Sequence, residues 1–502
     1  MNSPTLMKKP QSNAAASGVA LMGAATTTAA NFAIAALLGL RGTEFAGVFF
    51  AATALVAIVS NASALGTMTG QVFFMPRALQ GNAPNPRGLL VLALRPVTVV
   101  SAGAAAGLWA AAGTIGPLVE GSHGNEIASM LRVLALLVPA WALSLPLLGA
   151  TRGLGSMTPT VAVNQIFRPG AQLLSVGGVL LFMETPSPNL VGMAWGWPVL
   201  ASPLLALLAV ARLGGLSHST AHESTVTSQE FWRYTRPRAL STMFQVALER
   251  IDVILVSVLA GAGAAGVYGA VTRFITAGNF LIFSMGQATS GPLRRAVAAQ
   301  DWAKAQRLLQ QTTGWMVLVS WPYFLLLAVK GTPVINLLSP AYLSGAPVLA
   351  LLALGMLVNA LAGPIDLTLL MLGKSRASLI GAASALIADI LLAWFLIPRV
   401  GVIGAAIAWS VAVAIQNGLA TVLVHNSVRL HGPDRPALVA AAGALIAVVP
   451  IGLLTPDTLI GLLITGSCAA VVHAGWLIRH HATVHVPLHT IPVLRAATRS
   501  SA

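Results

Sequence analysis

Three ionisable residues, Glu249, Arg250 and Asp252, interrupt an otherwise apolar stretch from Leu240 to Ala260. As a helix with 1.5 Å rise per residue, this stretch is about 30 Å long, which matches the hydrocarbon core of a bilayer. A charged side chain at the membrane centre costs about 2.5–3.5 kcal/mol even on the most permissive scale. The cluster therefore predicts a helix that faces a protein interior or a watery cavity, and with it a path for a substrate or an ion.

On one continuous helix, Glu249 and Asp252 share a face because they are three residues apart, while Arg250 points about 100° away. Either carboxylate is a candidate to couple transport to H⁺ or Na⁺, and so is Asp389 in a later apolar stretch. Glu249 also has a structural alternative, an ion pair with Arg273 of the following span.

Arginines occur at depth in the first half of the chain as well, and Arg168 is the deepest. It lies nine residues into its predicted span, about 14 Å along the helix, which is beyond easy snorkelling. Guanidinium groups donate paired hydrogen bonds to phosphate oxygens, so arginines in a cavity favour an anionic, phosphate-bearing ligand. We predict that Arg168, Arg250 and Arg273 bind substrate. Arg95 is a further candidate, although it lies near an interface and its alternative is snorkelling to headgroups.

The composition is that of an integral membrane protein. Charged residues make up 8% of the 502 residues and hydrophobic residues 56%, whereas soluble domains contain about 25% charged residues. The net charge of +15 reflects membrane orientation, so we expect no nucleic-acid partner. Cys468, the single cysteine, excludes an internal disulfide. The sequence contains no phosphate-binding loop, nucleophile elbow or zinc motif, so we expect neither a metal nor another cofactor.

Hydropathy predicts an all-α polytopic protein with about 14 transmembrane helices. The predicted spans are 16–38, 46–72, 89–112, 127–149, 159–183, 191–211, 240–260, 267–290, 308–329, 346–371, 377–396, 402–424, 437–454 and 458–478. Most Lys and Arg residues outside these spans then lie on the side of the two termini, and the opposite side holds Arg41, Lys330 and Arg399. The positive-inside rule therefore places both termini in the cytoplasm.

The chain divides into two related halves. Glu44–Thr53 and Ala264–Thr272 open equivalent spans with similar Ala/Gly/aromatic patterns, which indicates a parallel repeat of six-span blocks.

Thr227 and Glu230 have capping-box spacing, and the aromatic and basic residues after them predict either a short surface helix or a plain linker. The predicted parts are a cytoplasmic N-terminus (1–15), an N-lobe (16–211), a cytoplasmic or interfacial linker (212–239), a C-lobe (240–424), two peripheral helices (437–478) and a cytoplasmic tail (479–502).

The segment Phe231–Phe274 carries an aromatic and basic run, a proline near the start of a span, an Ile-Asp pair and a Gly-Val-Tyr entry to the next span. It resembles the polysaccharide transporter family, the Wzx-like O-antigen flippases of the MOP superfamily. Leu40–Phe49 is similar to that family's first loop, and Ala64–Gly66 to its second span. The resemblance implies a MurJ/MATE-like V of two six-helix lobes with two peripheral helices. It also implies transfer of a lipid-diphosphate-linked oligosaccharide from the inner to the outer leaflet.

The same resemblance suggests which residues line the cavity. Lipid II flippases carry cavity arginines, and Arg273 falls close to one such place. The first span offers Asn31 where those flippases have an arginine, so Asn31 is a candidate substrate contact and lipid II itself is not the expected substrate. The first half lacks the cavity carboxylate usual in MATE exporters, which counts against a cation-coupled drug antiporter.

We therefore expect a transporter and not an enzyme: a plasma (inner) membrane flippase for polysaccharide or lipopolysaccharide precursors, working by alternating access. Its partners would be a lipid-linked anionic glycan, membrane lipids, and a polysaccharide polymerase or glycosyltransferases of the same cell-envelope pathway. The alternatives are an ion-coupled small-molecule antiporter of the same fold and a membrane glycan polymerase or glycosyltransferase. Enzymes of the second kind generally need acidic or arginine-bearing outer loops, whereas the predicted outer loops here are short, the 13 acidic residues are scattered, and no paired carboxylates stand at the outer membrane face.

Overall fold

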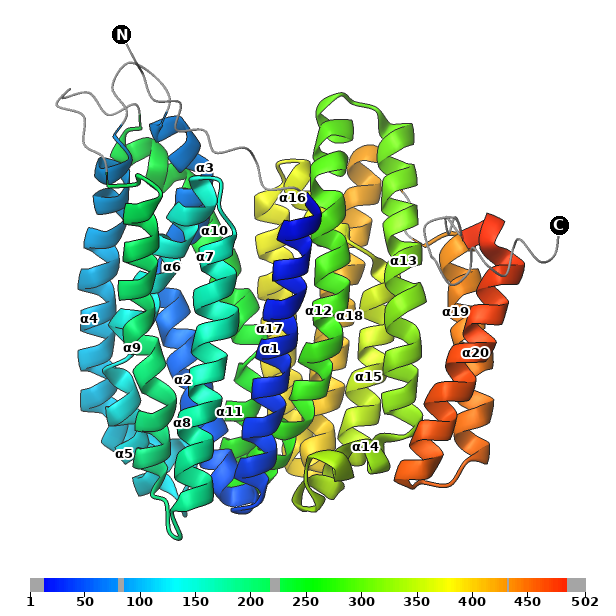
Figure 1. Cartoon of the computed structure of the whole chain (residues 1–502), viewed down its shortest axis with the longest axis horizontal. Coiled ribbons are helices and arrows are strands. Elements are labelled where there is room, and N and C mark those ends of the chain that lie inside the picture. The colour runs from blue at the N-terminus through cyan, green and yellow to red at the C-terminus, as the bar shows by residue number, and fades with distance from the viewer. Residues whose placement is uncertain (1–12, 80–84, 217–225, 431–432, 485–502) are drawn as a thin grey trace. The chain divides into compact units, whose positions relative to one another are not determined.

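The computed structural model describes residues 13–79, 85–216, 226–430 and 433–484. Within those ranges all regular structure is helical, which confirms the predicted all-α class (Figure 1). The chain forms two compact units, one ending at Ala262 and one beginning at Gly263. Most of the predicted N-terminal segment 1–15 and of the tail 479–502 lies outside the described residues.

The first unit contains twelve helical segments. They are α1 (Asn13–Gly39), α2 (Thr43–Ser63), α3 (Thr67–Ala78), α4 (Pro86–Val119), α5 (Gly124–Ala135), α6 (Val138–Gly153), α7 (Thr158–Thr160), the π-helix η1 (Val161–Phe167), α8 (Arg168–Phe182), α9 (Pro188–Arg212), α10 (Ser228–Leu248) and α11 (Ile251–Ala260). Helix α2 packs against α1, α4, α5, α6, α10 and α11, so it lies at the centre of this bundle.

The second unit follows the same all-helical design. Its segments are α12 (Ala262–Ala298), α13 (Trp302–Val329), α14 (Gly331–Leu338), the 3₁₀ helix η2 (Pro340–Gly345), α15 (Ala346–Ala362), α16 (Ile365–Met371), α17 (Ser375–Val400), α18 (Val402–Val428), α19 (Arg435–Leu454) and α20 (Leu459–Val484). Helix α13 packs against α15 on one side and against the hairpin of α19 and α20 on the other.

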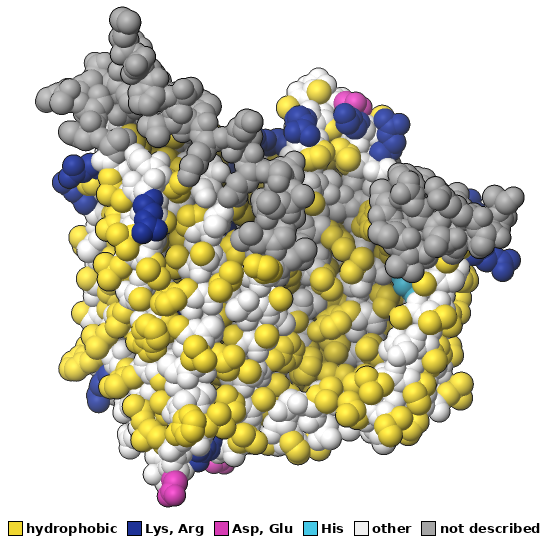
Figure 2. Space-filling model, in the orientation of Figure 1, with side chains coloured by type: hydrophobic (Ala, Val, Ile, Leu, Met, Phe, Trp, Pro, Cys, Tyr) yellow, Lys and Arg dark blue, Asp and Glu magenta, His cyan; other side chains and the backbone are white. Residues whose placement is uncertain are grey.

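Within the described residues, ten helices are long and apolar enough to cross a membrane. The number is up to eleven if the pair α5 and α6, bent by 44°, counts as one span. Hydrophobic side chains cover the middle of the helices on the face shown in Figure 2. Three of the fourteen predicted spans, 159–183, 240–260 and 267–290, are not among the ten or eleven. The polytopic architecture is therefore confirmed, and the number fourteen stays a prediction.

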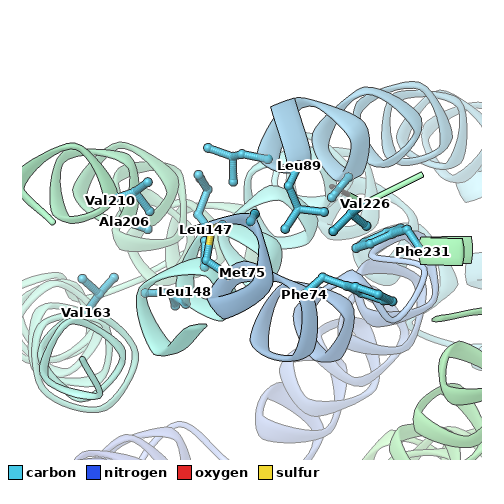
Figure 3. Packing of buried hydrophobic residues seen from close by; sticks show 14 residues of the cluster. Phe74, Met75, Leu89, Leu147, Leu148, Val163, Ala206, Val210, Val226 and Phe231 are labelled. Atoms are coloured by element: carbon cyan, nitrogen blue, oxygen red, sulfur yellow. The ribbon is translucent and has the colours of Figure 1, made fainter. Parts of the chain in front are cut away.

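A buried apolar cluster joins α10 to the rest of the first unit. Phe231 of α10 has no exposed surface and lies beside Phe74 of α3, with ring centroids 5.7 Å apart (Figure 3). Val163 of η1 belongs to the same cluster. Thr227 caps α10, since its side chain accepts a hydrogen bond from the Glu230 N–H at 3.2 Å, as the sequence predicted.

This packing changes the interpretation of the segment 212–239. Residues 228–239 form the first three turns of α10 rather than a separate surface helix or a plain linker. Phe231 points into the protein core instead of toward lipid headgroups. Helices α10 and α11 also group with the first unit, whereas the sequence assigned 240–260 to the second lobe.

Two consecutive residues with positive φ separate α2 from α3. Leu65 has φ 53° and Gly66 has φ 66°, so the helix is interrupted inside the predicted span 46–72, while α2 and α3 together still form one candidate span. A Cβ on Gly66 would lie 2.7 Å from the Ala239 Cα of α10. Because such a distance is too short for any contact between carbon atoms, the glycine permits α10 to approach this turn closely.

Lys330, at the end of α13, fixes the hairpin of α19 and α20. Its side chain is 1% exposed, and its Nζ donates to the Thr455 O at 2.6 Å, the Pro456 O at 3.2 Å and the Asp457 Oδ1 at 3.0 Å. All three acceptors lie in the loop between α19 and α20. The buried ammonium therefore holds this loop against the end of α13 within the second unit.

We expect Lys330→Met to loosen this loop and destabilise the protein by about 1.5–3 kcal/mol, the net value of hydrogen bonds to a charged group. Methionine retains an unbranched side chain that is one atom shorter and carries no ammonium, so the loss mainly reports the polar contacts. Hydrogen exchange of the peptides around Thr455 should rise. Asp457→Asn is the milder control, because the Asp457 side chain is 62% exposed and asparagine retains an acceptor. Unchanged exchange in the Lys330 variant would refute this anchoring role.

Candidate functional site

The charged cluster that interrupts the predicted span 240–260 coincides with a break in the helix. Helix α10 ends at Leu248 and α11 begins at Ile251, so Glu249 and Arg250 form the junction. Arg250 has φ −129° and ψ −23°, outside the helical region. Broken helices at membrane depth occur where the backbone lines a cavity or a binding site. The break therefore supports the prediction that this segment serves transport.

The break separates the two carboxylates that the sequence placed on one helix face. Glu249 is exposed, whereas Asp252 in the first turn of α11 is 4% exposed. The expectation of a shared face assumed a continuous helix, and that assumption is wrong. Glu249 and Arg250 are close enough for their opposite charges to attract.

Arg168 follows a π-helical turn that its neighbour Pro169 helps to explain. The Arg168 N–H donates to the Val163 O, five residues earlier. Pro169 has no N–H to donate to the Gln165 O, four residues before it, and the Thr27 Oγ1 of α1 donates to that oxygen at 3.0 Å. π-Helical turns often accompany functional sites. Here the turn sets the direction of the first residue of α8.

The face of α8 that carries Arg168 is fixed against α9. Gln172 Nε2 donates to the Trp195 O at 3.0 Å, and Ser175 Oγ donates to the Ala194 O at 2.6 Å. Arg168, Gln172 and Ser175 are spaced by four and three residues, so they share one helix face. At the far end of α8, the Arg41 guanidinium donates to the carbonyls of Leu180, Met183 and Glu184 at 2.5–2.6 Å. Helix α8 is thus held at both ends.

The Arg168 guanidinium lies among aromatic rings inside the first unit. Its Cζ is 3.8 Å from the centroid of the Trp141 ring of α6 and 5.9 Å from that of Trp195 of α9. The two indoles are 5.9 Å apart, and Phe49 of α2 packs edge-on against Trp195 at 6.1 Å. Within the described part of the chain, no carboxylate forms an ion pair with Arg168. Its charge is therefore stabilised by aromatic faces.

Arg168 and Arg250 are close enough for their like charges to repel each other. Both side chains are half-buried, so water screens this repulsion less than it would at a surface. An anion that contacted both guanidinium groups would relieve the repulsion and accept up to two pairs of hydrogen bonds. This arrangement in one compact unit is suited to binding a phosphate or a diphosphate.

The remaining predicted residues lie elsewhere. Arg273 of α12, in the second unit, is half-buried and interacts electrostatically with the buried Tyr342 of η2. Asp389 of α17 has no exposed surface. Asn31 is half-buried on α1, which packs against α2, η1 and α8. Arg95 is exposed on α4, one turn from Val99, whose exposed fraction is 73%.

Exposure of Arg95 beside Val99 places it on a face of α4 that the first unit leaves uncovered. This position agrees with the snorkelling alternative for Arg95. Glu249 and Arg273 belong to different units, and their pairing stays a prediction.

Sequence reasoning did not select the aromatic partners of Arg168. Trp141 lies near the middle of the predicted span 127–149, although tryptophans of membrane proteins concentrate at the interfaces. That unusual depth was the available signal. The contact itself joins α6 to α8 across 27 positions, and no sequence spacing indicates it.

Solved structures show which fold this is. The lipid II flippase MurJ in an inward closed conformation matches with a TM-score of 0.73 and 12% identity, covering 93% of this chain and 99% of that one. A MATE family multidrug resistance transporter of the MOP superfamily matches in its inward-facing conformation with a TM-score of 0.62 and 15% identity, over 80% of this chain and 94% of that one. An outward-facing structure of a MATE family transporter matches with a TM-score of 0.57 and 15% identity, over 84% of this chain and 97% of that one.

At the level of sequence, residues 237–395 match the MatE family model, and this range includes Arg250, Arg273 and Asp389. No curated protein matches the sequence. The comparisons confirm the predicted MurJ/MATE-like fold, and the matched structures are those of a flippase and of transporters rather than of enzymes. The assignment to the polysaccharide transporter family stays a prediction.

Proposed function

We propose that this membrane protein, which has the fold of MurJ and of MATE transporters, is a flippase. It would move a lipid-diphosphate-linked oligosaccharide from the inner to the outer leaflet of the plasma membrane by alternating access, with both termini in the cytoplasm. The match to MurJ over 93% of the chain supports a lipid-linked substrate. A polysaccharide polymerase and glycosyltransferases would use or supply this substrate.

The observation that carries the proposal is the pair Arg168 and Arg250. In the described part of the chain, Arg168 is paired with aromatic rings instead of a carboxylate, and Arg250 supplies a second positive charge in the same compact unit. An organic cation would add to the repulsion, whereas a diphosphate would neutralise both groups. The site therefore favours an anion as the transported headgroup.

Other predicted residues take supporting roles in this proposal. Arg273 of the second unit and Asn31 of α1 remain candidate substrate contacts. Glu249, Asp252 and Asp389 are the candidates to bind the coupling H⁺ or Na⁺. Asp252 and Asp389 fit that role through their burial, because a buried carboxylate responds strongly to the binding of a cation.

The second candidate function is an ion-coupled small-molecule antiporter. The MatE family model, which matches residues 237–395, and the MATE transporter structures favour it. The proposed anion site argues for the flippase, since multidrug antiport of cations gains nothing from paired arginines.

Reconstitution in proteoliposomes tests both candidates. The vesicles contain the full chain and a fluorescent polyprenyl-diphosphate disaccharide in both leaflets, and dithionite bleaches the outer leaflet. A flippase brings inner-leaflet lipid to the surface, so the bleached fraction exceeds that of empty vesicles. A neutral glycolipid with the same fluorophore is the matched control and should stay protected. Efflux of an organic cation down a Na⁺ or H⁺ gradient, without transfer of the diphosphate lipid, would establish the antiporter instead.

A further inference from the structure

The aromatic residues around Arg168 come from three different helices and form one connected group. Trp141 of α6 lies directly under the guanidinium, Trp195 of α9 lies 5.9 Å from it, and Phe49 of α2 supports Trp195 from the side. We call these three residues the aromatic cradle. Hydrogen bonds from Gln172 and Ser175 to the backbone of α9 fix Trp195 relative to α8. The cradle is therefore a preformed part of the first unit.

The aromatic cradle differs from a carboxylate partner because it leaves the N–H donors of the Arg168 guanidinium available. An aromatic ring attracts the cation through its negative face and accepts none of the five N–H donors of the guanidinium in strong hydrogen bonds. A carboxylate would accept two of those donors and would compete with an anionic ligand. Cation–π contact stabilises the charge of Arg168 in an apolar bundle while its donors remain free for an anion.

We propose that Trp141 is a positioning residue, which holds the Arg168 guanidinium ready to bind an anion. This inference rests on the proposed function, because it assigns to Arg168 the diphosphate of the transported lipid. Trp195 and Phe49 limit the movement of Trp141 and so fix the direction of the guanidinium. The chemistry recognised is that of a phosphate or diphosphate anion.

Graded fluorination of Trp141 tests this role. Mono-, di- and tri-fluorinated tryptophan, incorporated at this position in the full chain, weakens the negative face of the ring step by step with little change in size. Binding of inorganic pyrophosphate is measured by calorimetry in nanodiscs. We expect the association constant to fall progressively with each fluorine, by about 2-fold to 30-fold over the series, which corresponds to the usual range of cation–π energies.

A matched series at Trp109 controls for fluorination itself. Trp109 of α4 also faces a guanidinium, with the Arg132 Cζ 5.9 Å from its ring, but its side chain is 52% exposed. Pyrophosphate binding should not change in that series. Trp141→Leu is the packing control, because it removes the ring altogether. Loss of packing alone would not produce the graded response expected from the fluorine series.

A flat response at Trp141 with intact pyrophosphate binding would overturn the positioning role, and so would failure of the unmodified protein to bind pyrophosphate. The outcome separates this inference from the proposed function. A graded response in a protein that transfers no diphosphate lipid would sustain the anion site and refute the flippase. Transfer of the lipid with a flat response at Trp141 would sustain the flippase and refute the positioning role of Trp141.

Discussion

Replacing Arg168 and Arg250 together by alanine is expected to abolish transfer of the diphosphate-linked lipid while the protein remains at its normal level in the membrane. Each substitution removes hydrogen bonds from a charged donor, worth about 1.5–3 kcal/mol, which corresponds to about 10-fold to 150-fold in binding. The cost to the folded protein is the loss of the cation–π contacts of Arg168, about 0.5–2 kcal/mol. Loss of transfer in a stable protein is the expected signature.

A lysine variant separates the effect of the positive charge from that of the hydrogen-bond geometry. Arg168→Lys keeps a positive charge but loses the planar fork, so we expect a partial defect between those of the wild type and Arg168→Ala. Arg399→Ala is the matched control, since Arg399 is occupied by the Phe395 carbonyl and ring. Transfer rates are measured in the proteoliposomes described above. Wild-type transfer by the double alanine variant would disprove a role for this pair.

The predicted contribution of Arg273 to substrate binding can be examined in the same assay. The Arg168→Ala, Arg273→Ala variant loses one candidate guanidinium from each unit, and we also expect it to lose transfer. An effect no larger than that of Arg168→Ala alone would remove Arg273 from the binding site.

Gly66→Ala is expected to be among the most destabilising single-methyl additions in the first unit, by about 2–5 kcal/mol. Its positive φ of 66° disfavours any side chain, which costs about 1–2 kcal/mol. The new Cβ would also lie 2.7 Å from the Ala239 Cα and 2.8 Å from its N. Since backbone atoms of α10 cannot rotate away, the helices must separate, and overpacking of this kind costs about 1–3 kcal/mol.

Gly155→Ala provides the matched comparison for this prediction. Gly155 also has positive φ, 86°, but nothing lies within 4 Å of the position of its Cβ. It should therefore show the conformational cost alone. Thermal unfolding of both variants in the same detergent measures the difference. Equal stability of the two would mean that α10 does not depend on the close approach at Gly66.

The sequence predicted the helical class and the multi-pass membrane architecture because these follow from hydropathy and from helix length. It did not predict the break at Glu249 and Arg250. Apolar residues on both sides of the cluster give a continuous helical pattern, and no glycine or proline marks the junction. The inferred common face of Glu249 and Asp252 failed for that reason.

The role of Phe231 shows a second limit. Its neighbours Trp232 and Arg233 are typical of a membrane surface, and the pattern alone predicted headgroup contact. Phe231 is buried because Phe74 lies opposite it on α3, a contact between residues far apart in the chain. Tertiary partners of this kind, like Trp141 under Arg168, depend on how the helices pack, which local periodicity does not encode.

The three predicted spans that are not among the candidate membrane helices carry Arg168, the Glu249–Asp252 cluster and Arg273. Insertion of a segment into the bilayer during synthesis depends on its own composition, and an ionisable residue near its centre raises the cost. Helices that precede these segments in the chain and pack against them, such as α1 for α8 and α2 for α10 and α11, would lower that cost during insertion. The order in which the chain emerges from the ribosome thus bears on how each of these polar segments enters the membrane.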